Sequence, residues 1–150
     1  MRTLPESFKN AVSGLTYIWL TERNMRIHLA TGATALGLAF LGRISLVKSL
    51  FVLSAILVVI LSEVVNTAIE SLVDLSTTEY HPLAAKCKDI AAGAVLLGAC
   101  YAVLVGLAVF VPEFPSLAGN IVLSISERPL SAGFWTVLVA ALWYEALARR

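Results

Sequence analysis

One stretch of this sequence limits what the chain can become more than any other feature. Residues 90–111 are 22 consecutive residues without a charged side chain, and about 20 apolar residues in a helix are enough to cross the hydrocarbon core of a bilayer. The composition agrees, because only 14% of the 150 residues are charged, against about 25% in a typical soluble domain. The net charge of +1 gives no broad basic surface for nucleic acid. We therefore predict an all-α integral membrane bundle in a single domain, residues 1–150.

Four stretches are predicted to be transmembrane helices. Residues 25–42 and 49–75 form the first two, and residues 88–111 enclose the charge-free stretch. Residues 129–147 are predicted to be a fourth, C-terminal span; the alternative is a helix lying in the interface, because its apolar part is only 16 residues long. The region between the third and fourth spans contains two prolines and a glycine that are predicted to make it a loop: Pro112, Pro115 and Gly119.

The first 22 residues have a different pattern from the spans. Apolar residues recur every three or four positions with polar residues between them, which is typical of an amphipathic helix; they are Leu4, Phe8, Val12, Leu15 and Trp19. This helix lies either on the membrane surface or against the bundle, and the pattern does not choose between the two. The first ten residues contain no apolar segment followed by a small-residue cleavage site, so we expect no cleavable signal peptide.

The positions of lysine and arginine predict the orientation of the spans. When the N-terminus is placed in the cytoplasm, eight basic residues face the cytoplasm and three face the outside, in agreement with the positive-inside rule. The outer three are Arg43, Lys48 and Arg128, and the cytoplasmic eight are Arg2, Lys9, Arg23, Arg26, Lys86, Lys88, Arg149 and Arg150. We therefore expect a multi-pass protein with a cytoplasmic N-terminus.

Polar residues inside the second span are the strongest functional signal. Glu63, Asn66, Glu70 and Asp74 are spaced three, four and four residues apart, so they share one face of a helix. An ionised side chain near the bilayer centre costs about 2.5–3.5 kcal/mol on insertion scales, so such a row needs an explanation. It either makes polar contacts between helices or binds a cation or proton. Its oxygen donors suit a hard ion such as Mg²⁺, which usually takes one or two carboxylates plus substrate phosphates.

Further polar residues are expected at the same cytoplasmic depth. Glu22 lies just before the first span, and Lys88 and Asp89 begin the third. Carboxylates with one lysine suit a metal–nucleotide complex, because the metal bridges phosphate oxygens and the ammonium neutralises charge on the transferred group. For Lys88 and Asp89 taken alone, a solvated helix start is the alternative. The sequence contains neither a P-loop nor a dinucleotide-binding glycine motif, so a nucleotide would have to bind in another way.

Three separated motifs resemble a known family. They are TERNMRIH at residues 21–28, SEVVNTAIESLVDL at 62–75 and EYHPLAAKCKDIAAGAVLL at 79–97. Over about residues 6–111 the chain resembles the prokaryotic diacylglycerol kinase family of integral-membrane lipid kinases, and within it the undecaprenol kinase branch. The resemblance implies ATP- and Mg²⁺-dependent transfer of the γ-phosphate to the hydroxyl of a membrane lipid, with undecaprenol favoured over diacylglycerol. It also implies a homotrimer with shared active sites in the bacterial cytoplasmic (inner) membrane.

The resemblance also assigns roles to matching positions. Glu63 matches the general base that accepts the proton of the lipid hydroxyl, and Glu22 and Glu70 match the acids that hold Mg²⁺ with the nucleotide. The positions that the resemblance places around the nucleotide are Glu22, Glu70, Glu79, His81, Lys88 and Asp89, and the supporting positions are Asn66, Asp74 and His28. Taken alone, the two histidines would more simply be structural or surface residues.

One alternative of a different class stays open. Intramembrane carboxylates also mark ion pathways, so the acidic stripe is compatible with a non-enzymatic membrane protein that uses it as an ion or proton pathway or for helix packing. A pathway would need polar groups toward the outer face as well, and the first and third spans have few there. We therefore favour the lipid kinase. Members of the family usually have three spans after the surface helix, so residues 112–150 are an addition to the pattern.

Overall fold

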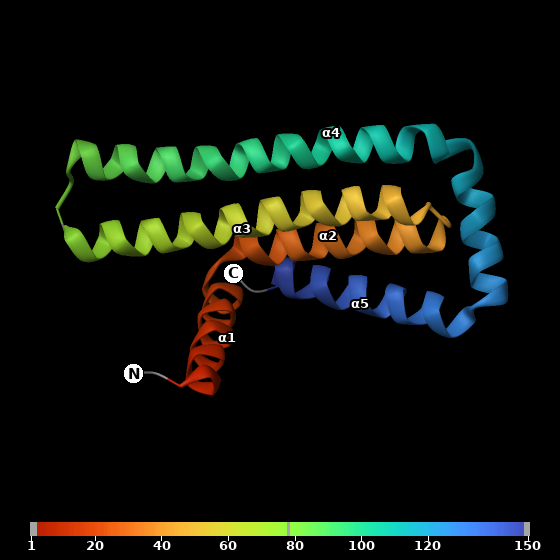
Figure 1. The fold of residues 1–150 in the computed structure, drawn as a ribbon, viewed down its shortest axis with the longest axis horizontal. Coiled ribbons are helices and arrows are strands. Elements are labelled where there is room, and N and C mark those ends of the chain that lie inside the picture. Colours follow the sequence, from red (N-terminus) through yellow and green to blue (C-terminus); the bar gives the residue numbers. More distant parts are fainter. Residues whose placement is uncertain (1–2, 78, 149–150) are drawn as a thin grey trace.

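The structure, a computed structural model, describes residues 3–77 and 79–148 and is helical almost throughout. Its five helices are α1 (Leu4–Thr21), α2 (Arg23–Leu41), α3 (Leu46–Ser76), α4 (Pro82–Glu127) and α5 (Pro129–Ala148). In Figure 1, α2, α3, α4 and α5 run along a common direction, and α1 runs across it. The described residues contain no strand. The predicted all-α membrane bundle is therefore confirmed.

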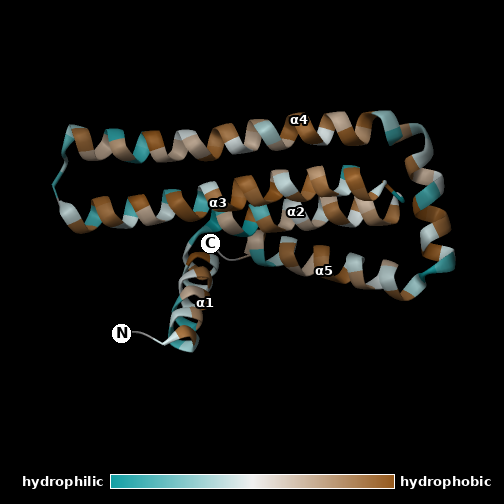
Figure 2. Ribbon diagram, in the orientation of Figure 1, coloured by the Kyte–Doolittle hydropathy of each residue, from teal (hydrophilic) through white to brown (hydrophobic). Residues whose placement is uncertain are grey.

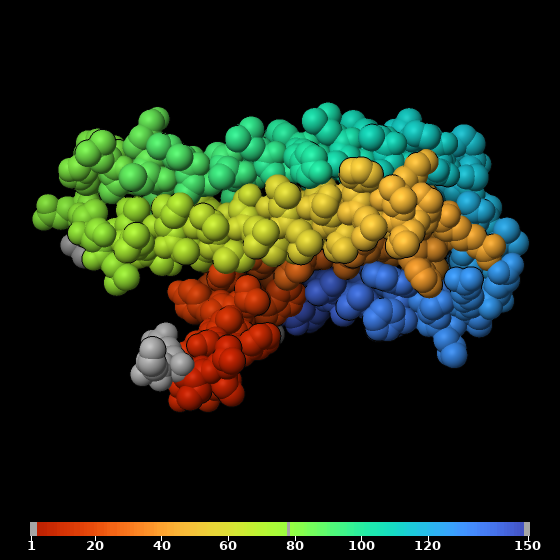
Figure 3. All heavy atoms as spheres, viewed as in Figure 1, coloured from red at the N-terminus to blue at the C-terminus, as the bar shows by residue number. Residues whose placement is uncertain are grey.

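Helix α1 covers the predicted amphipathic segment. It starts with a capping box, in which the Thr3 hydroxyl accepts a hydrogen bond from the Glu6 backbone and the Thr3 N–H donates to the Glu6 carboxylate at 2.8 Å. Its apolar residues Leu4 and Phe8 are 85% and 77% exposed, and Ile18 near its end is buried. Figure 3 shows α1 projecting from the bundle. These exposures support the surface-helix interpretation over a helix docked along the bundle.

Three of the helices are long and apolar enough to cross a membrane, namely α3, α4 and α5, and hydrophobic residues cover most of their length in Figure 2. Helix α2 is not among them, although residues 25–42 are predicted to span. Its first two turns carry Arg23, Arg26 and His28, which lower its mean hydropathy. Its 19 residues make a helix of about 28 Å, close to the roughly 30 Å of a hydrocarbon core. The α2 span stays a prediction that this length supports.

The loop predicted between the third and fourth spans is wrong. Helix α4 continues through Pro112 and Pro115 as far as Glu127, and Figure 1 shows it bending sharply before its last part, which runs across the end of the bundle. A proline removes one helical hydrogen bond and clashes with the preceding turn, and this kinks a helix as readily as it ends one. We call residues 113–127, the part of α4 after the first proline, the transverse segment.

Contacts with the turn between α2 and α3 stabilise the transverse segment. The Asn120 side chain donates to the Gly42 carbonyl at 3.0 Å, and the Ser124 hydroxyl donates to the Leu41 carbonyl at 2.8 Å. Arg43 pairs with Glu127 in the same region. These partners lie about 80 residues apart in sequence, so the spacing of the prolines alone could not reveal them. They hold the segment in a helical conformation that its local sequence does not predict.

Helix α5 packs along α2, as Figure 1 shows. The Trp143 indole N–H donates to the Thr34 hydroxyl at 3.1 Å, and the Trp135 ring lies over Gly37, where an added Cβ would come within 3.1 Å of it. Glycine is therefore favoured here, because a larger residue would require the Trp135 ring to shift. The position alongside α2, together with a length and composition suited to spanning, supports a fourth span over a helix lying in the interface.

The two crosswise elements, α1 and the transverse segment, lie at opposite ends of α2 (Figure 1). Their separation along the bundle is thus set by the length of α2, about 28 Å. Helices α3 and α4 extend past α1 into the region beyond it. This arrangement fits a bilayer with one crosswise element at each surface, and α3, at 31 residues, reaches well outside it. Arg2, Arg149 and Arg150, which the orientation prediction also uses, lie outside the described residues.

Candidate active site

Glu63 is the centre of the candidate site. It lies on α3, is 1% exposed, and is the largest fully buried side chain in the described part of the chain. The His28 Nε2 on α2 is 4.0 Å from the Glu63 Oε2, and this buried oxygen has no hydrogen-bond partner among the described residues. The Thr67 hydroxyl donates to the Glu63 backbone carbonyl, not to the carboxylate. The structure therefore holds a buried carboxylate beside an imidazole, with one oxygen that has no hydrogen-bond partner among the described residues.

Two further acids of the prediction come close to Glu63. Glu22, between α1 and α2, and Glu70, two turns along α3, are near enough that their charges act on the Glu63 carboxylate electrostatically. The Asn66 amide donates to the Glu70 Oε1 at 2.9 Å, and its own buried Oδ1 has no hydrogen-bond partner among the described residues. Asn66 thereby fixes the orientation of Glu70, in agreement with a supporting role.

No three Asp, Glu, His or Cys side chains of residues 3–77 and 79–148 are grouped closely enough to hold a metal ion by themselves. The oxygen donors of Glu22 and Glu70 nevertheless suit Mg²⁺, which usually needs only one or two protein carboxylates because water and phosphate oxygens fill the other positions. The donor set therefore fits a metal that arrives with a nucleotide.

Sequence reasoning missed the role of Arg26. Its side chain is 4% exposed, and its Nη1 donates to the carbonyls of Trp19 and Leu20 at the end of α1, at 3.2 and 3.1 Å. These bonds join α1 to α2 at the junction that carries Glu22. The available signal is an arginine inside a predicted span, where a charge is costly without a purpose. The positive-inside rule alone gives this arginine only a role in orientation.

A second group of predicted residues lies at the connection between α3 and α4. A depression of about 260 Å³ has Asp74, Glu79, His81 and Lys88 among its lining residues. The Lys88 ammonium pairs with the Asp74 carboxylate, and the His81 Nδ1 accepts a hydrogen bond from the Leu83 backbone, which caps the start of α4. Asp89 is exposed and does not line this depression.

The two groups are arranged in line along α3. Asp74 lies eleven residues after Glu63, which corresponds to about 16 Å along a helix, and Glu70 lies between them. Glu63 is opposite His28, about 7 Å inside the start of α2 by the same rise. The buried carboxylate is thus just inside the bundle. Asp74 lies two residues before the end of α3 at Ser76, and this end of α3 extends beyond α1 in Figure 1.

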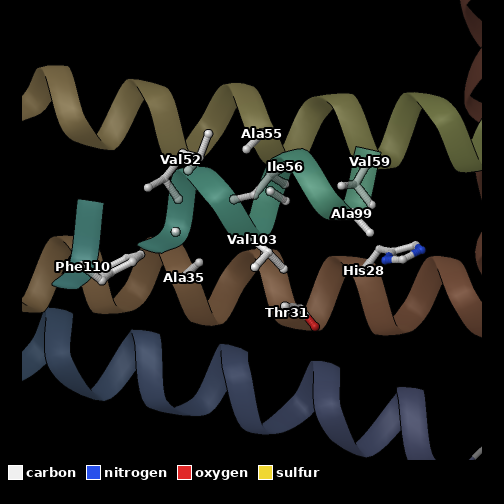
Figure 4. A pocket seen from close by; sticks show the side chains of 14 residues that line it. His28, Thr31, Ala35, Val52, Ala55, Ile56, Val59, Ala99, Val103 and Phe110 are labelled. Carbon is white, nitrogen blue, oxygen red and sulfur yellow. The ribbon is translucent and has the colours of Figure 1, made fainter. Parts of the chain in front are cut away.

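An apolar pocket approaches the site from the other side. It has a volume of about 250 Å³, lies between α2, α3 and α4, and is lined mainly by small and aliphatic residues. Figure 4 shows His28 at one end of this pocket and Phe110 at the other, with Thr31 between them on α2. The site therefore has a hydrocarbon-like cavity on its membrane side and charged groups on the opposite side.

Comparison with known proteins identifies the family. Residues 9–110 match the family model of the prokaryotic diacylglycerol kinases, a region that contains every residue of the candidate site. The chain belongs to the prokaryotic diacylglycerol kinase family. The predicted family and the prediction of an enzyme of the lipid kinase type are thereby confirmed, and the match ends before the transverse segment.

Relatives in the family carry two different names. A diacylglycerol kinase of Synechocystis is 44% identical over 113 residues, which are 74% of this chain and 64% of that protein. An undecaprenol kinase of Bacillus subtilis is 38% identical over 72% of this chain and 88% of its own length. The diacylglycerol kinase of Escherichia coli K12 is 30% identical over 61% of this chain and 75% of its own. No solved structure gives a significant match to the chain.

Proposed function

We propose that this protein transfers the γ-phosphate of ATP to the hydroxyl of a membrane lipid in a Mg²⁺-dependent reaction. The observation that carries the proposal is the buried Glu63 carboxylate, whose unpartnered Oε2 lies 4.0 Å from His28, a residue that lines the apolar pocket. On the other side, Glu63 has further acids along α3. A lipid alcohol matches this arrangement, because its hydrocarbon chain suits an apolar pocket and its hydroxyl reacts with a charged phosphate. Membership of a lipid kinase family supports the same reaction.

In the proposed reaction Glu63 is the general base. It accepts the proton of the lipid hydroxyl while the hydroxyl oxygen forms a bond to the γ-phosphorus and the bond from that phosphorus to the β-phosphate oxygen breaks, which releases ADP. A base has to come within about 3 Å of the proton donor, and the Glu63 Oε2, which has no hydrogen-bond partner among the described residues, is the proposed acceptor. Because phosphoryl transfer depends mainly on positioning and charge stabilisation, no covalent enzyme intermediate is required.

Glu22 and Glu70 are the proposed Mg²⁺ ligands. Asn66 orients the Glu70 carboxylate through its amide, and Arg26 fixes the junction of α1 and α2 on which Glu22 lies. When bound, Mg²⁺ supplies positive charge to the phosphate oxygens. A homotrimer with shared sites is also proposed, on the resemblance to the family.

The residues around the depression at the α3–α4 connection are proposed to bind the nucleotide. Lys88 offers an ammonium group, and Glu79 and His81 offer polar contacts in the loop before it. In this proposal Lys88 exchanges its Asp74 partner for a phosphate when ATP binds. Asp89, the exposed residue after Lys88, is proposed as a further contact with the nucleotide at the edge of this depression. The Asp74 group and Glu63 lie about 16 Å apart along α3, a separation that an extended nucleotide has to bridge.

The acceptor is proposed to enter along the apolar pocket, with undecaprenol favoured over diacylglycerol. The relatives carry both names, and an apolar cavity discriminates weakly, by about 1–3 kcal/mol per methylene at best. The ion-pathway alternative gains no support from this pocket, because among the described residues its lining contains only two polar side chains, Thr31 and His28. A bacterial cytoplasmic (inner) membrane location with a cytoplasmic N-terminus completes the proposal.

The test uses purified protein in mixed micelles with γ-labelled ATP, and follows label into the organic phase. Undecaprenol and diacylglycerol are offered separately, each with Mg²⁺ and with Mg²⁺ removed by chelation. We expect Mg²⁺-dependent label in at least one lipid, and the ratio of the two rates identifies the acceptor. Folded protein that transfers no label to either lipid, and does not bind Mg-ATP, would contradict the proposal and return the acidic stripe to the ion-site hypothesis.

A further inference from the structure

A large depression lies at the end of the bundle opposite Glu63. It has a volume of about 580 Å³ and is formed by the end of α2, the turn after it and the starts of α3 and α5. Two arginines are among its lining residues, Arg43 in the turn and Arg128 at the junction of α4 and α5. This site is separate from the proposed active site, and α5, which supplies part of it, lies beyond the region that matches the kinase family.

The backbone at Arg43 has a conformation that usually requires glycine. Its φ of 56° is the only positive value at a non-glycine residue in the described ranges, and an L-residue with a bulky side chain pays for this left-handed geometry. Such an outlier is a reason to look for a function of the side chain. The Arg43 guanidinium is fixed by bonds to the Ser124 hydroxyl and the Glu127 carboxylate, which leave it at the edge of the depression.

Arg128 gives the depression a net positive charge. Glu127 offsets the charge of Arg43, but Arg128 is exposed and none of the ion pairs found among residues 3–77 and 79–148 involves it. An anion is therefore favoured here.

The walls of the depression are apolar. Leu36 and Phe40 line it from α2, and Trp135 lines it from α5, with the Trp135 ring 6.2 Å from the Phe40 ring. A free phosphate ion gains nothing from such walls, whereas a phospholipid presents an anionic headgroup next to its hydrocarbon chains. Basic pockets between membrane helices bind anionic headgroups in this way, and aromatic side chains are enriched at that depth.

We propose that this depression binds the headgroup of an anionic phospholipid in the leaflet opposite the active site. Arg128 and Arg43 contact the phosphate, and Leu36, Phe40 and Trp135 contact the upper part of an acyl chain. The lipid joins α2, α3 and α5 at this end of the bundle. The proposal does not depend on the kinase reaction, because it uses none of the residues assigned to it.

The test is native mass spectrometry of the whole protein released from membranes that contain equal amounts of phosphatidylglycerol and phosphatidylcholine. We expect wild-type protein to retain phosphatidylglycerol preferentially. Arg128→Gln should reduce that preference about fivefold, the expected effect of one basic residue near the surface. Lys48→Gln is the matched control, because it removes a cation at the same end that pairs with Glu113 and does not line the depression. It should leave the preference unchanged.

Three outcomes would overturn the proposal. The first is equal lipid preference in Arg128→Gln and Lys48→Gln. The second is displacement of the retained lipid by millimolar inorganic phosphate, which would make this a free-anion site. The third is that Arg128→Gln loses oligomers but keeps its bound lipid, which would show that a second copy of the chain fills the depression. Arg43→Gln should match Arg128→Gln; if it fails to fold, the exposed Arg128 decides the result alone.

Discussion

The two ends of the bundle differ in how their buried polar groups are partnered. At one end the Glu63 Oε2 and the Asn66 Oδ1 are buried and have no hydrogen-bond partner within the described residues. At the other end the buried Ser124 hydroxyl donates to the Leu41 carbonyl and accepts from the Arg43 Nε, and Glu127 pairs with Arg43. The first end lies inside the region shared with the kinase family, and Ser124 lies outside it.

This contrast separates two uses of polar residues in an apolar bundle. A buried polar atom without a partner costs about 1–3 kcal/mol, so each one needs an explanation, and a ligand that completes it is one such explanation. A buried polar atom with its bonds made stabilises the fold and needs no ligand to complete it. The contrast predicts that substitutions at the Glu63 end change catalysis with little loss of stability, and that substitutions at the Ser124 end do the reverse.

The largest effect is expected for Glu63→Gln. The amide keeps the size of the side chain but cannot accept the proton of the lipid hydroxyl, so turnover should fall by about 10²–10⁴-fold with Mg-ATP binding and the unfolding temperature nearly unchanged. Glu127→Gln is the control, because it removes a carboxylate from the opposite end of the bundle, where Glu127 pairs with Arg43. Its turnover should stay within about twofold of wild type. Label transfer to lipid and thermal unfolding measure both. Turnover of Glu63→Gln within about tenfold of wild type would show that Glu63 is not the base.

A smaller effect is expected for the proposed metal ligands. Glu70→Gln and Glu22→Gln should each raise the Mg²⁺ concentration needed for half-maximal activity by about tenfold, since metal sites lose roughly 10–100-fold in affinity when their support is removed. Glu113→Gln at the paired end is the control and should titrate as wild type. Initial rates over a Mg²⁺ series give the result. If both site variants titrate as wild type, neither acid binds the metal.

Lys88→Ala should weaken nucleotide binding by roughly fivefold. A charge-assisted contact to phosphate is lost, and its strength is limited because the side chain is partly exposed and screened by water. Lys86→Ala is the matched control, because Lys86 is on the same helix, is exposed and does not line the depression. Equilibrium binding of Mg-ATP distinguishes the two. Equal affinities in the two variants would assign Lys88 to the solvated helix start that the sequence left open.

The smallest effect is expected at the opposite end, and on stability alone. Ser124→Ala removes the hydrogen bond to the Leu41 carbonyl and should cost about 1 kcal/mol, or roughly 2–4 °C in unfolding temperature. Turnover should stay at the wild-type level. Ser126→Ala is the control, because its hydroxyl is exposed and bonds only within its own helix. A loss of turnover in Ser124→Ala without a loss of stability would contradict the view that polar residues at this end serve the fold and those at the Glu63 end serve catalysis.

Much of this molecule could be predicted from its sequence, because the signals are local. Apolar runs and their periodicity locate the helices, with ends within a few residues for α2 and α5. The spacing of Glu63, Asn66 and Glu70 on one helix face gives the acidic stripe, and Glu22 follows because it precedes the neighbouring span.

The parts that could not be predicted depend on residues far apart in the chain. The transverse segment stays helical because it bonds to the turn near Gly42, across 78 residues. From the sequence, Arg26 indicates only the orientation of the spans in the membrane. Its bonds to the Trp19 and Leu20 carbonyls become known only from the structure. The lack of a hydrogen-bond partner at the Glu63 Oε2 is likewise a consequence of packing, because the spacing of residues in the sequence does not reveal which atoms lack partners.

The two crosswise elements have a consequence for how the protein responds to its membrane. Because α1 and the transverse segment are joined to opposite ends of α2, their separation of about 28 Å cannot follow the thickness of the surrounding lipid. A thicker or thinner bilayer therefore has to deform around the protein, at a cost of fractions of a kcal/mol per Å of hydrophobic mismatch. If the proposed function is right, the depth of Glu63 below the headgroups is then set by the protein itself, and a lipid hydroxyl would meet it at the same level in membranes of different thickness.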